Sequence, residues 1–376
     1  MKVAFNARLL RSPTLRGWNR YTINLLSELA MLGIEIFLYS DQPIHIDHLA
    51  RLPEGSYQIR LSPPMRYPMW EQWWMPTQCQ KDRIDILHCP FNFGLPYFSP
   101  CPRVLTLHDA IDEVYYGKNA TWQERFKLSS LQMDVHNRIA RTKAEAIITV
   151  SNHAKSDLIK HLDIPESKIT VIYEAADQKF HEPVSSEQRL HIRDLYKLNQ
   201  PYVFYLGGWE KRKNIPFLVK SFADANLDNV NLVLAGGNVE QKVELTNLAK
   251  ELGIEDRLVL LEWIEDNDLP ALYAEALCFV YPSEYEGFGL QLCEAMAVGC
   301  PVLAARETCL PEILGNGGET FNLQTVDKLK ELMENINTDR QLLNQLKISA
   351  KHRSQDFTWG KTAQQTLEIY KSISIR

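Results

Sequence analysis

The feature that most limits the fold of this chain is an alternation of short apolar runs with longer segments of helical period. This alternation is typical of βαβ units, in which crossover helices join parallel strands. In the first half, the runs predict strands at residues 3–5, 34–39, 84–89, 104–107, 146–150 and 169–172. In the second half, they predict strands at residues 202–206, 231–235, 258–261, 277–281 and 301–304. We therefore predict an α/β protein built on parallel sheets.

The chain has 376 residues, which is more than one hydrophobic core usually serves. A polar stretch at 174–200 carries no strand pattern and predicts a linker. We therefore expect two Rossmann-like domains, residues 1–182 and 183–356, facing each other across a cleft at their strand edges. The last segment, 357–376, has apolar residues spaced for one helical face and predicts a terminal helix.

Charge and cysteine content exclude several classes of protein. The net charge is -6, and neither half has a basic stripe that would follow a phosphate backbone, so we expect no nucleic-acid partner. The seven cysteines are odd in number and include no CxxC pair, which predicts reduced thiols. No signal peptide or membrane span is apparent, which predicts a cytoplasmic protein. Peripheral contact with an anionic membrane remains open.

The segment PSEYEGFGLQLCEAMAVGCPV, residues 282–302, reads as a strand end, a loop and a helix. Gly287 and Gly289 leave the backbone uncluttered at the helix start, where N–H groups and the helix dipole favour an anion such as a phosphate. Glu286 and Glu294 flank this place, and carboxylates accept hydrogen bonds from sugar hydroxyls. These residues alone also allow a glycine turn with two surface glutamates.

A second loop, LGGWEKRKN, follows the strand at 202–206 and carries Lys211, Arg212 and Lys213. A positioned cation stabilises the charge that a departing diphosphate gains in the transition state. Cations at a helix start without a catalytic role are the alternative.

Two further candidates lie in the first half. His108 and Asp109 follow a strand in VLTLHD, so the histidine is expected at the crevice edge, although a lone histidine is more often structural. Gly17, in TLRGWNRY, would let the backbone approach a phosphate, whereas Arg20 and Tyr21 are expected to be structural.

The sequence EGFGLQLCE followed by AMAVGCPV resembles the EX7E motif of the retaining glycosyltransferases of family four, which have the GT-B fold of two Rossmann-like domains. The resemblance implies that Glu294 binds the ribose and that Glu286 contacts the donor sugar. It places main chain along the diphosphate at Gly287, Phe288, Gly289 and Leu290. It also implies a hydrogen bond from His108 to the sugar near its sixth carbon, with Asp109 as a further candidate.

The loop at 206–214 departs from the family pattern at one position. The family usually has an arginine two residues into this loop and a lysine five residues later; this chain keeps Lys213 but has Gly208 in place of the arginine. Arg212 is expected to replace it, as in a subgroup with an EPRKN-like loop that includes mannosyltransferases. TLRGWNRY is similar to the family's GxGRY loop, with Gly17 kept and Asn19 at the second glycine.

The last part of the resemblance is FTWGKTAQQTLEIY, which is similar to the family's crossover helix. It implies that 357–376 packs on the N-terminal domain. The N-terminal domain is then expected to bind the acceptor and the C-terminal domain the donor.

The resemblance implies a retaining hexosyltransferase that moves a sugar from a nucleoside diphosphate donor, of the GDP-mannose or UDP-glucose type, to a hydroxyl of a glycan, lipid or small molecule. No cofactor or metal is expected. The residues expected to act in catalysis are His108, Arg212, Lys213 and Glu286. The alternatives are a nucleotide-sugar epimerase on the same fold and a non-catalytic sugar-nucleotide-binding subunit.

Two other patterns are expected to be structural. The DxD triplet beginning at Asp266 precedes an apolar helical segment and predicts a helix cap, since two carboxylates alone make a poor Mg²⁺ site. The helical spacing of Met69, Trp70, Trp73 and Trp74 favours core packing over a membrane or acceptor platform.

Overall fold

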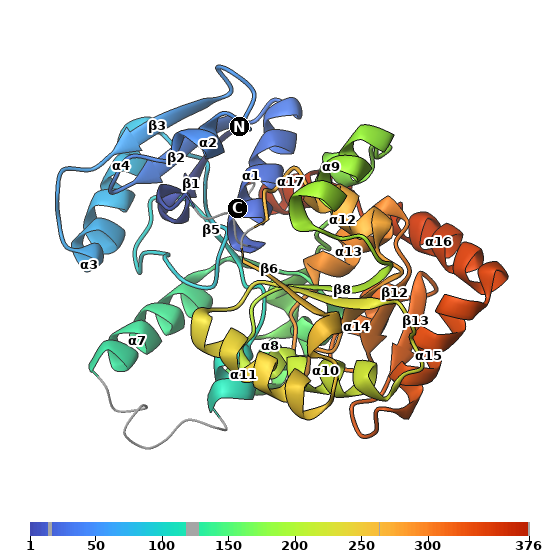
Figure 1. Cartoon of the computed structure of the whole chain (residues 1–376). Helices are drawn as coiled ribbons and strands as arrows, with labels where there is room; N and C mark the ends of the chain where they lie inside the picture. The colour runs from blue at the N-terminus through green and yellow to red at the C-terminus, as the bar shows by residue number, and fades with distance from the viewer. Residues whose placement is uncertain (14–16, 118–127, 263, 375–376) are drawn as a thin grey trace. The chain divides into compact units, whose positions relative to one another are not determined.

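A computed structural model describes residues 1–13, 17–117, 128–262 and 264–374 (Figure 1). The chain divides into two compact units: the first combines Met1–Glu174 with Trp359–Arg376, and the second is Ala175–Thr358. Each unit contains one parallel sheet with its own helices. Within the described ranges, no helix is both long and apolar enough to cross a membrane.

The first unit contains a seven-stranded parallel sheet in the order β3-β2-β1-β4-β5-β6-β7. Its strands are β1 (Lys2–Asn6), β2 (Glu35–Ser40), β3 (Tyr57–Leu61), β4 (Ile86–Cys89), β5 (Arg103–Thr106), β6 (Ala146–Thr149) and β7 (Ile169–Val171). Its α-helices are α1 (Gly17–Met31), α2 (Ile46–Leu49), α3 (Tyr67–Met69), α4 (Met75–Asp82), α7 (Leu128–Lys143), α8 (Asn152–Leu162) and α17 (Trp359–Ser374). Among its described residues are also the 3-10 turns η1 (Arg8–Arg11) and η4 (Glu166–Lys168) and the π-helical turns η2 (Trp70–Trp74) and η3 (Asp112–Tyr116).

The second unit contains a six-stranded parallel sheet in the order β10-β9-β8-β11-β12-β13. Its strands are β8 (Tyr202–Leu206), β9 (Asn231–Ala235), β10 (Leu258–Leu261), β11 (Cys278–Tyr281), β12 (Val302–Ala305) and β13 (Gly318–Phe321). Its α-helices are α9 (Ser186–Tyr196), α10 (Ile215–Asp224), α11 (Val239–Glu251), α12 (Leu269–Glu275), α13 (Leu290–Val298), α14 (Leu310–Leu314), α15 (Asp327–Thr338) and α16 (Arg340–Ser354). The 3-10 turns are η5 (Gln178–Phe180), η6 (Lys211–Lys213) and η7 (Glu255–Arg257).

The two sheets share a strand order that reverses direction once. In the first sheet the reversal falls between β1 and β4, and in the second between β8 and β11. Loops that leave the carboxyl ends of the two strands at such a point turn to opposite sides and open a crevice, where ligands of Rossmann-like sheets bind. The predicted α/β fold with two Rossmann-like sheets is confirmed.

Every predicted strand is present, but two strands of the structure carried no signal that we recognised. These are β3 and β13, which lie at sheet edges and are half-exposed rather than apolar throughout. Central strands such as β4 and β12 are buried along their whole length, as expected for parallel strands covered on both faces. The sequences of β3 and β13 lack such a continuous apolar run, so the apolar pattern misses them, whereas it finds the edge strands β7 and β10.

The stretch at 174–200, predicted as the linker, begins at Glu174, where the chain divides, and has no strand. It contains η5 and α9, and α9 begins with a capping box in which Ser185 accepts from the backbone of Gln188 and the Gln188 side chain accepts from the backbone of Ser185. Arg189 and Arg193 then bind Glu275 on α12, which holds α9 in the second unit. The division falls after Glu174, eight residues before the expected boundary at 182.

Helix α17 belongs to the first unit, where it lies beside α1 (Figure 1). Its buried face carries Trp359, Ala363, Ile369 and Tyr370. Trp359 packs edge-on against the ring of Tyr21 on α1. Residues 375 and 376 of the predicted crossover segment lie outside the described ranges.

Candidate donor site

Two loops of the second unit meet at the carboxyl edge of its sheet because β8 and β11 are neighbours. The loop after β8 contains η6, and the loop after β11 runs through 282–289 to α13. Gly236, at the end of β9, has φ +116°, and an added Cβ would lie 2.1 Å from the carbonyl oxygen of Gly207. Glycine is therefore required where the chain leaving β9 touches the chain leaving β8.

Glu286 is the centre of a compact polar cluster formed by these two loops. Its Oε1 accepts hydrogen bonds from Lys213 Nζ at 2.5 Å, Arg212 Nη1 at 2.9 Å and Ser283 Oγ at 2.5 Å. Lys213 Nζ also donates to Tyr281 Oη at 2.9 Å. The structure thus brings together three of the residues predicted from the two separate motifs.

The charges of this cluster stabilise one another. Burial acts to raise the pKa of Glu286, but Lys213 and Arg212 outweigh it, and the pKa lies below its ordinary value. Burial lowers the pKa of Lys213, against the attraction of Glu286. The hydrogen-bonded cluster thus holds two cations against one carboxylate, and Glu210 adds a second negative charge that acts on Lys213.

Helix α13 begins at the same edge. Gly289 is its N-cap, with φ +88° and no side-chain cap, and an added Cβ there would lie 3.1 Å from Leu310. Its first turn therefore starts from glycine backbone, at the end of the helix that favours anions. Phe288 and Leu290 are buried, and the ring of Phe288 packs edge-on against Phe357.

Glu294 lies in the middle of α13, and only 3% of its surface is exposed. Its Oε2 accepts a hydrogen bond from Tyr273 Oη, on α12, at 3.0 Å. The tyrosine is fully buried, so it fixes one carboxylate oxygen of Glu294 in place.

The space beside Gly208, the position where the family usually has an arginine, is occupied by the carboxylate of Glu210. An added Cβ at Gly208 would lie 2.4 Å from the Glu210 carboxylate, and the carbonyl of Gly208 accepts from Tyr205 Oη at 2.7 Å. A larger residue at 208 would have to displace Glu210. Arg212 instead reaches the cluster, where Nη1 also donates to the carbonyl oxygen of Tyr285 at 3.0 Å.

The residues predicted in the first unit have different surroundings. His108 is buried, and its two ring nitrogens lie 2.9 Å from Glu174 Oε1 and 3.0 Å from the carbonyl oxygen of Pro90. Asp109 accepts from the backbone of Ile111 at 3.2 Å. Gly17 starts α1 with open space around it, so no contact with the described residues requires glycine there.

The sequence predicts structural roles for Arg20 and Tyr21. Tyr21 is fully buried, and its hydroxyl lies 3.0 Å from Thr106 Oγ1. Arg20 is also buried.

Several contacts of the candidate residues were missed in the sequence. Ser283 stands in the motif itself, three residues before Glu286, and a hydroxyl at that distance could have been recognised. The fold alone brings three other partners to the candidate residues: Tyr273 to Glu294, Tyr281 to Lys213 and Glu174 to His108. Glu174, for example, is 66 residues from His108 along the chain. No local pattern marks such partners.

The DxD triplet is structural, but it caps no helix through its side chains. Asp266 pairs with Lys179, and Asp268 accepts from Tyr196 Oη at 2.8 Å. Asp268 occupies the N-cap position of α12 without a capping hydrogen bond, because its carboxylate is turned toward α9. Within the described ranges, no three histidine, cysteine or acidic side chains are grouped to hold a metal ion.

The core packing predicted for residues 69–74 is present for only two of the four residues named, Trp70 and Trp74. Trp70 is fully buried and Trp74 half-buried, whereas Met69 and Trp73 are exposed at 50% and 64%. The chain is π-helical at η2, so the even helical spacing assumed from the sequence does not apply there.

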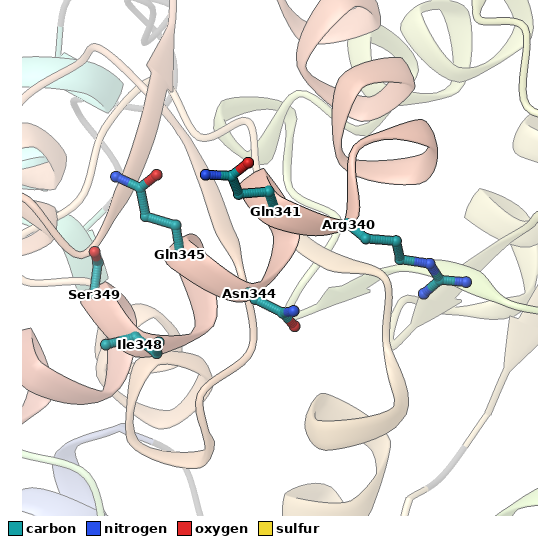
Figure 2. Close-up of a pocket in the computed structure, with 6 residues that line it drawn as sticks. All are labelled: Arg340, Gln341, Asn344, Gln345, Ile348 and Ser349. Atoms are coloured by element: carbon teal, nitrogen blue, oxygen red, sulfur yellow. The ribbon is translucent and has the colours of Figure 1, made fainter.

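A surface hollow in the second unit lies away from all predicted residues. Figure 2 shows that its lining comes from one helix, α16, whose side chains point in several directions. It is lined by Arg340, Gln341, Asn344, Gln345, Ile348 and Ser349. It contains no grouped charges that could perform chemistry, so the cluster around Glu286 remains the candidate site.

The fold and this cluster define the class, a two-unit Rossmann-like protein with a cation-rich site at a sheet's carboxyl edge. Two family models match the chain: "Glycosyltransferase Family 4" over residues 15–180 and "Glycosyl transferases group 1" over residues 187–353. The chain belongs to the group 1 glycosyltransferases of family four, so the resemblance stated from the sequence is confirmed. It is a glycosyltransferase enzyme.

Curated relatives and solved structures agree with this assignment. The O-antigen chain mannosyltransferase B of Escherichia coli is 26% identical over 398 residues, covering 99% of this chain and 100% of that protein. The serotype-specific mannosyltransferase WbdA of Escherichia coli is 31% identical over 63% of this chain, which is 30% of that longer protein. HepE of Anabaena, solved with UDP and glucose, shares the fold with a TM-score of 0.76 at 19% identity, covering 99% of this chain and 100% of that one. These similarities do not favour an epimerase.

Proposed function

We propose that this enzyme transfers a hexose from a nucleoside diphosphate sugar to an acceptor hydroxyl with retention of the anomeric configuration. The observation that carries the proposal is the pairing of Lys213 and Arg212 with Glu286 beside the N-terminus of α13. Cations, a carboxylate and a helix start then lie together in the domain that matches the group 1 model.

Lys213 and Arg212 are assigned to the diphosphate. The leaving group gains negative charge as its bond to the sugar breaks, and fixed cations in a buried site stabilise that charge. Gly287, Gly289 and the first turn of α13 supply backbone N–H groups on the same side. Arg212 takes the role of the arginine that Gly208 replaces.

The two glutamates are assigned to the sugar and the ribose. Glu286 is assigned to a hexose hydroxyl, while its Oε1 holds the cations. Glu294, oriented by Tyr273, accepts from the ribose. His108 and Asp109 are kept as candidates for the hexose from the sequence.

GDP-mannose is the donor we favour. Support comes from two relatives that are named mannosyltransferases, one matched over 99% of this chain and the other over 63%. HepE, solved with UDP and glucose, makes UDP-glucose the second candidate. We propose that no metal or other cofactor takes part.

The acceptor is a glycan, a lipid-linked sugar or a small molecule. Peripheral membrane contact by the first unit has one support, an exposed apolar surface of Met69, Trp73, Tyr97 and Phe98. The backbone N–H of Tyr97 donates to Gln72. This hydrogen bond joins the two chain segments, 69–73 and 97–98, that form the exposed surface. Sedimentation with vesicles of anionic phospholipid tests this: wild-type protein is expected to bind more than Trp73→Ser, and equal binding would oppose it.

The decisive experiment measures nucleoside diphosphate release from GDP-, UDP- and ADP-sugars with and without glycan or lipid-linked acceptors. A transferase is expected to release diphosphate much faster with acceptor. An epimerase would convert the donor without release, and a silent subunit would bind the donor and do neither. Anomeric signals of the product in NMR then establish whether the configuration is retained.

A further inference from the structure

A buried hydrogen bond in the first unit joins His108 to Glu174. The imidazole Nδ1 lies 2.9 Å from Glu174 Oε1, and 6% of each side chain is exposed. The Nε2 atom lies 3.0 Å from the carbonyl oxygen of Pro90. His108 follows β5, whereas Glu174 follows β7 and is the last residue before the second unit begins.

The partners of the ring determine its protons. A carbonyl oxygen only accepts, so Nε2 must carry a hydrogen. An ionised Glu174 also only accepts, so Nδ1 must carry one as well, and an imidazole with both hydrogens is a cation. Burial works against that charge, but the hydrogen bond and charge of Glu174 outweigh it, and the pKa of His108 lies above its ordinary value.

The other groups that face the ring do not replace Glu174. Trp18 stacks on it and Tyr21 meets it edge-on, with centroids 5.9 and 4.8 Å away. Asp109 adds a weaker attraction. His88 is itself kept neutral, since burial and the charge of His108 together lower its pKa to about 3. Glu174 is thus the one carboxylate in contact with His108 among the described residues.

We propose that Glu174 is a positioning residue that, with the carbonyl of Pro90, holds His108 in a fixed plane as a doubly protonated cation. A hexose oxygen that meets this ring then accepts a hydrogen bond from Nε2–H in exchange for Pro90 and never donates one. The use of this contact in transfer rests on the proposed function, whereas the ion pair itself does not.

The first test is an NMR titration of the imidazole nitrogens in the full-length protein, with the His108 signals assigned by their loss in His108→Gln. In wild-type protein, His108 is expected to keep both hydrogens at pH 7. In Glu174→Gln, which keeps an accepting oxygen but removes the charge, the midpoint is expected to fall by about one pH unit or more. A neutral wild-type ring, or the same midpoint in both proteins, would overturn the proposal.

The second test is the pH profile of kcat/KM for the preferred donor. Activity is expected to fall as pH rises through the His108 midpoint, and this alkaline limb should move to lower pH in Glu174→Gln. The matched control is Glu145→Gln, which breaks a surface pair with Arg103 in the same unit. A merely structural Glu174 would lower kcat equally at every pH. Absence of transfer by the wild-type enzyme would refute the proposed function and leave the titration as the test of the pair.

Discussion

A single oxygen, Oε1 of Glu286, accepts from the side chains of Arg212, Lys213 and Ser283. Such a carboxylate holds two cations at a fixed spacing, which a flexible surface pair would not do. The side chains of both cations therefore lose their conformational freedom when the protein folds, before a donor binds.

Replacing Arg212 by alanine is expected to lower kcat by about 10²–10³-fold, the usual effect of removing one donor that stabilises transition-state charge. The reason is its hydrogen bonds to Glu286 and the Tyr285 carbonyl, which place the guanidinium beside the start of α13. Steady-state kinetics with the preferred donor measures this. Lys211→Ala, an exposed cation one position earlier in the loop, is the control and should retain full activity. Equal effects of the two changes would disprove the role of Arg212.

Glu294→Ala is expected to raise the donor KM with a smaller change in kcat, because the ribose contact is made equally in the ground and transition states. Tyr273→Phe should have the same effect at lower amplitude, since it loses only the hydrogen bond that orients the carboxylate. Such a bond to a charged group contributes about 1.5–3 kcal/mol. Donor kinetics unchanged in both variants would refute the ribose assignment.

The site residues differ in how much of their position could be predicted from the sequence. Glu286, Gly289 and Glu294 follow one another in a motif, so their common location was predictable from spacing. Lys213 belonged to another motif, and the strand pattern predicted its loop at a sheet edge but not the bond to Glu286. The Glu174 contact was beyond prediction, because it depends on β5 and β7 lying on either side of β6.

At the scale of elements, a buried polar network ties α17 to the sheet of the first unit. Tyr370 Oη lies 2.5 Å from His88 Nδ1, and His88 Nε2 lies 2.8 Å from Thr106 Oγ1, which also meets Tyr21. The network crosses four elements, α17, β4, β5 and α1. Apolar spacing predicted the helical face of α17 but gave no sign of these polar contacts.

Tyr370→Phe is expected to destabilise the first unit by about 1–3 kcal/mol, because it leaves a buried nitrogen of His88 without its partner. Urea unfolding followed by tryptophan fluorescence measures the change. The control is Lys371→Ala, an exposed neighbour on the same helix, which should stay within about 0.5 kcal/mol of wild type. A loss as small as the control's would show that the network contributes no stability.

His88 also predicts acid sensitivity. Its pKa in the folded state is about 3, below the ordinary value of 6.5, because burial disfavours the charged ring. Protonation therefore favours unfolding, so the stability that His88 contributes is complete above pH 6.5 and is lost as pH falls toward 3. Unfolding free energies between pH 7 and 5 should fall less steeply in His88→Gln than in wild type. Parallel slopes would contradict this.

At the scale of the whole molecule, the two units differ in how the chain builds them. The second is continuous, Ala175–Thr358, whereas the first needs the distant segment Trp359–Arg376. The expected boundary at 182 missed this by eight residues because η5 already packs in the second unit, where Phe180 meets Tyr273. A change from polar to apolar sequence does not reveal which of the two units a short turn such as η5 packs in.

Residues 175–358 expressed alone are expected to fold cooperatively and to bind GDP or UDP, since they contain Arg212 and Lys213, assigned to the diphosphate, and Glu294, assigned to the ribose. Residues 1–358 should show one weakened thermal transition, because removal of α17 uncovers Tyr21 and His88. Differential scanning calorimetry and titration calorimetry measure these outcomes. Loss of the nucleotide-binding transition in the longer fragment would contradict the division into units.

The discontinuity of the first unit has a consequence for biosynthesis. Domains usually fold in order as they leave the ribosome, N-terminal first. Here the segment that completes the first unit is translated after the whole second unit, so the first unit emerges before the second but gains a finished core after it. A polypeptide terminated before α17 would carry a complete second unit and an unfinished first unit, and the exposed apolar surface of the first unit would direct it to proteolysis.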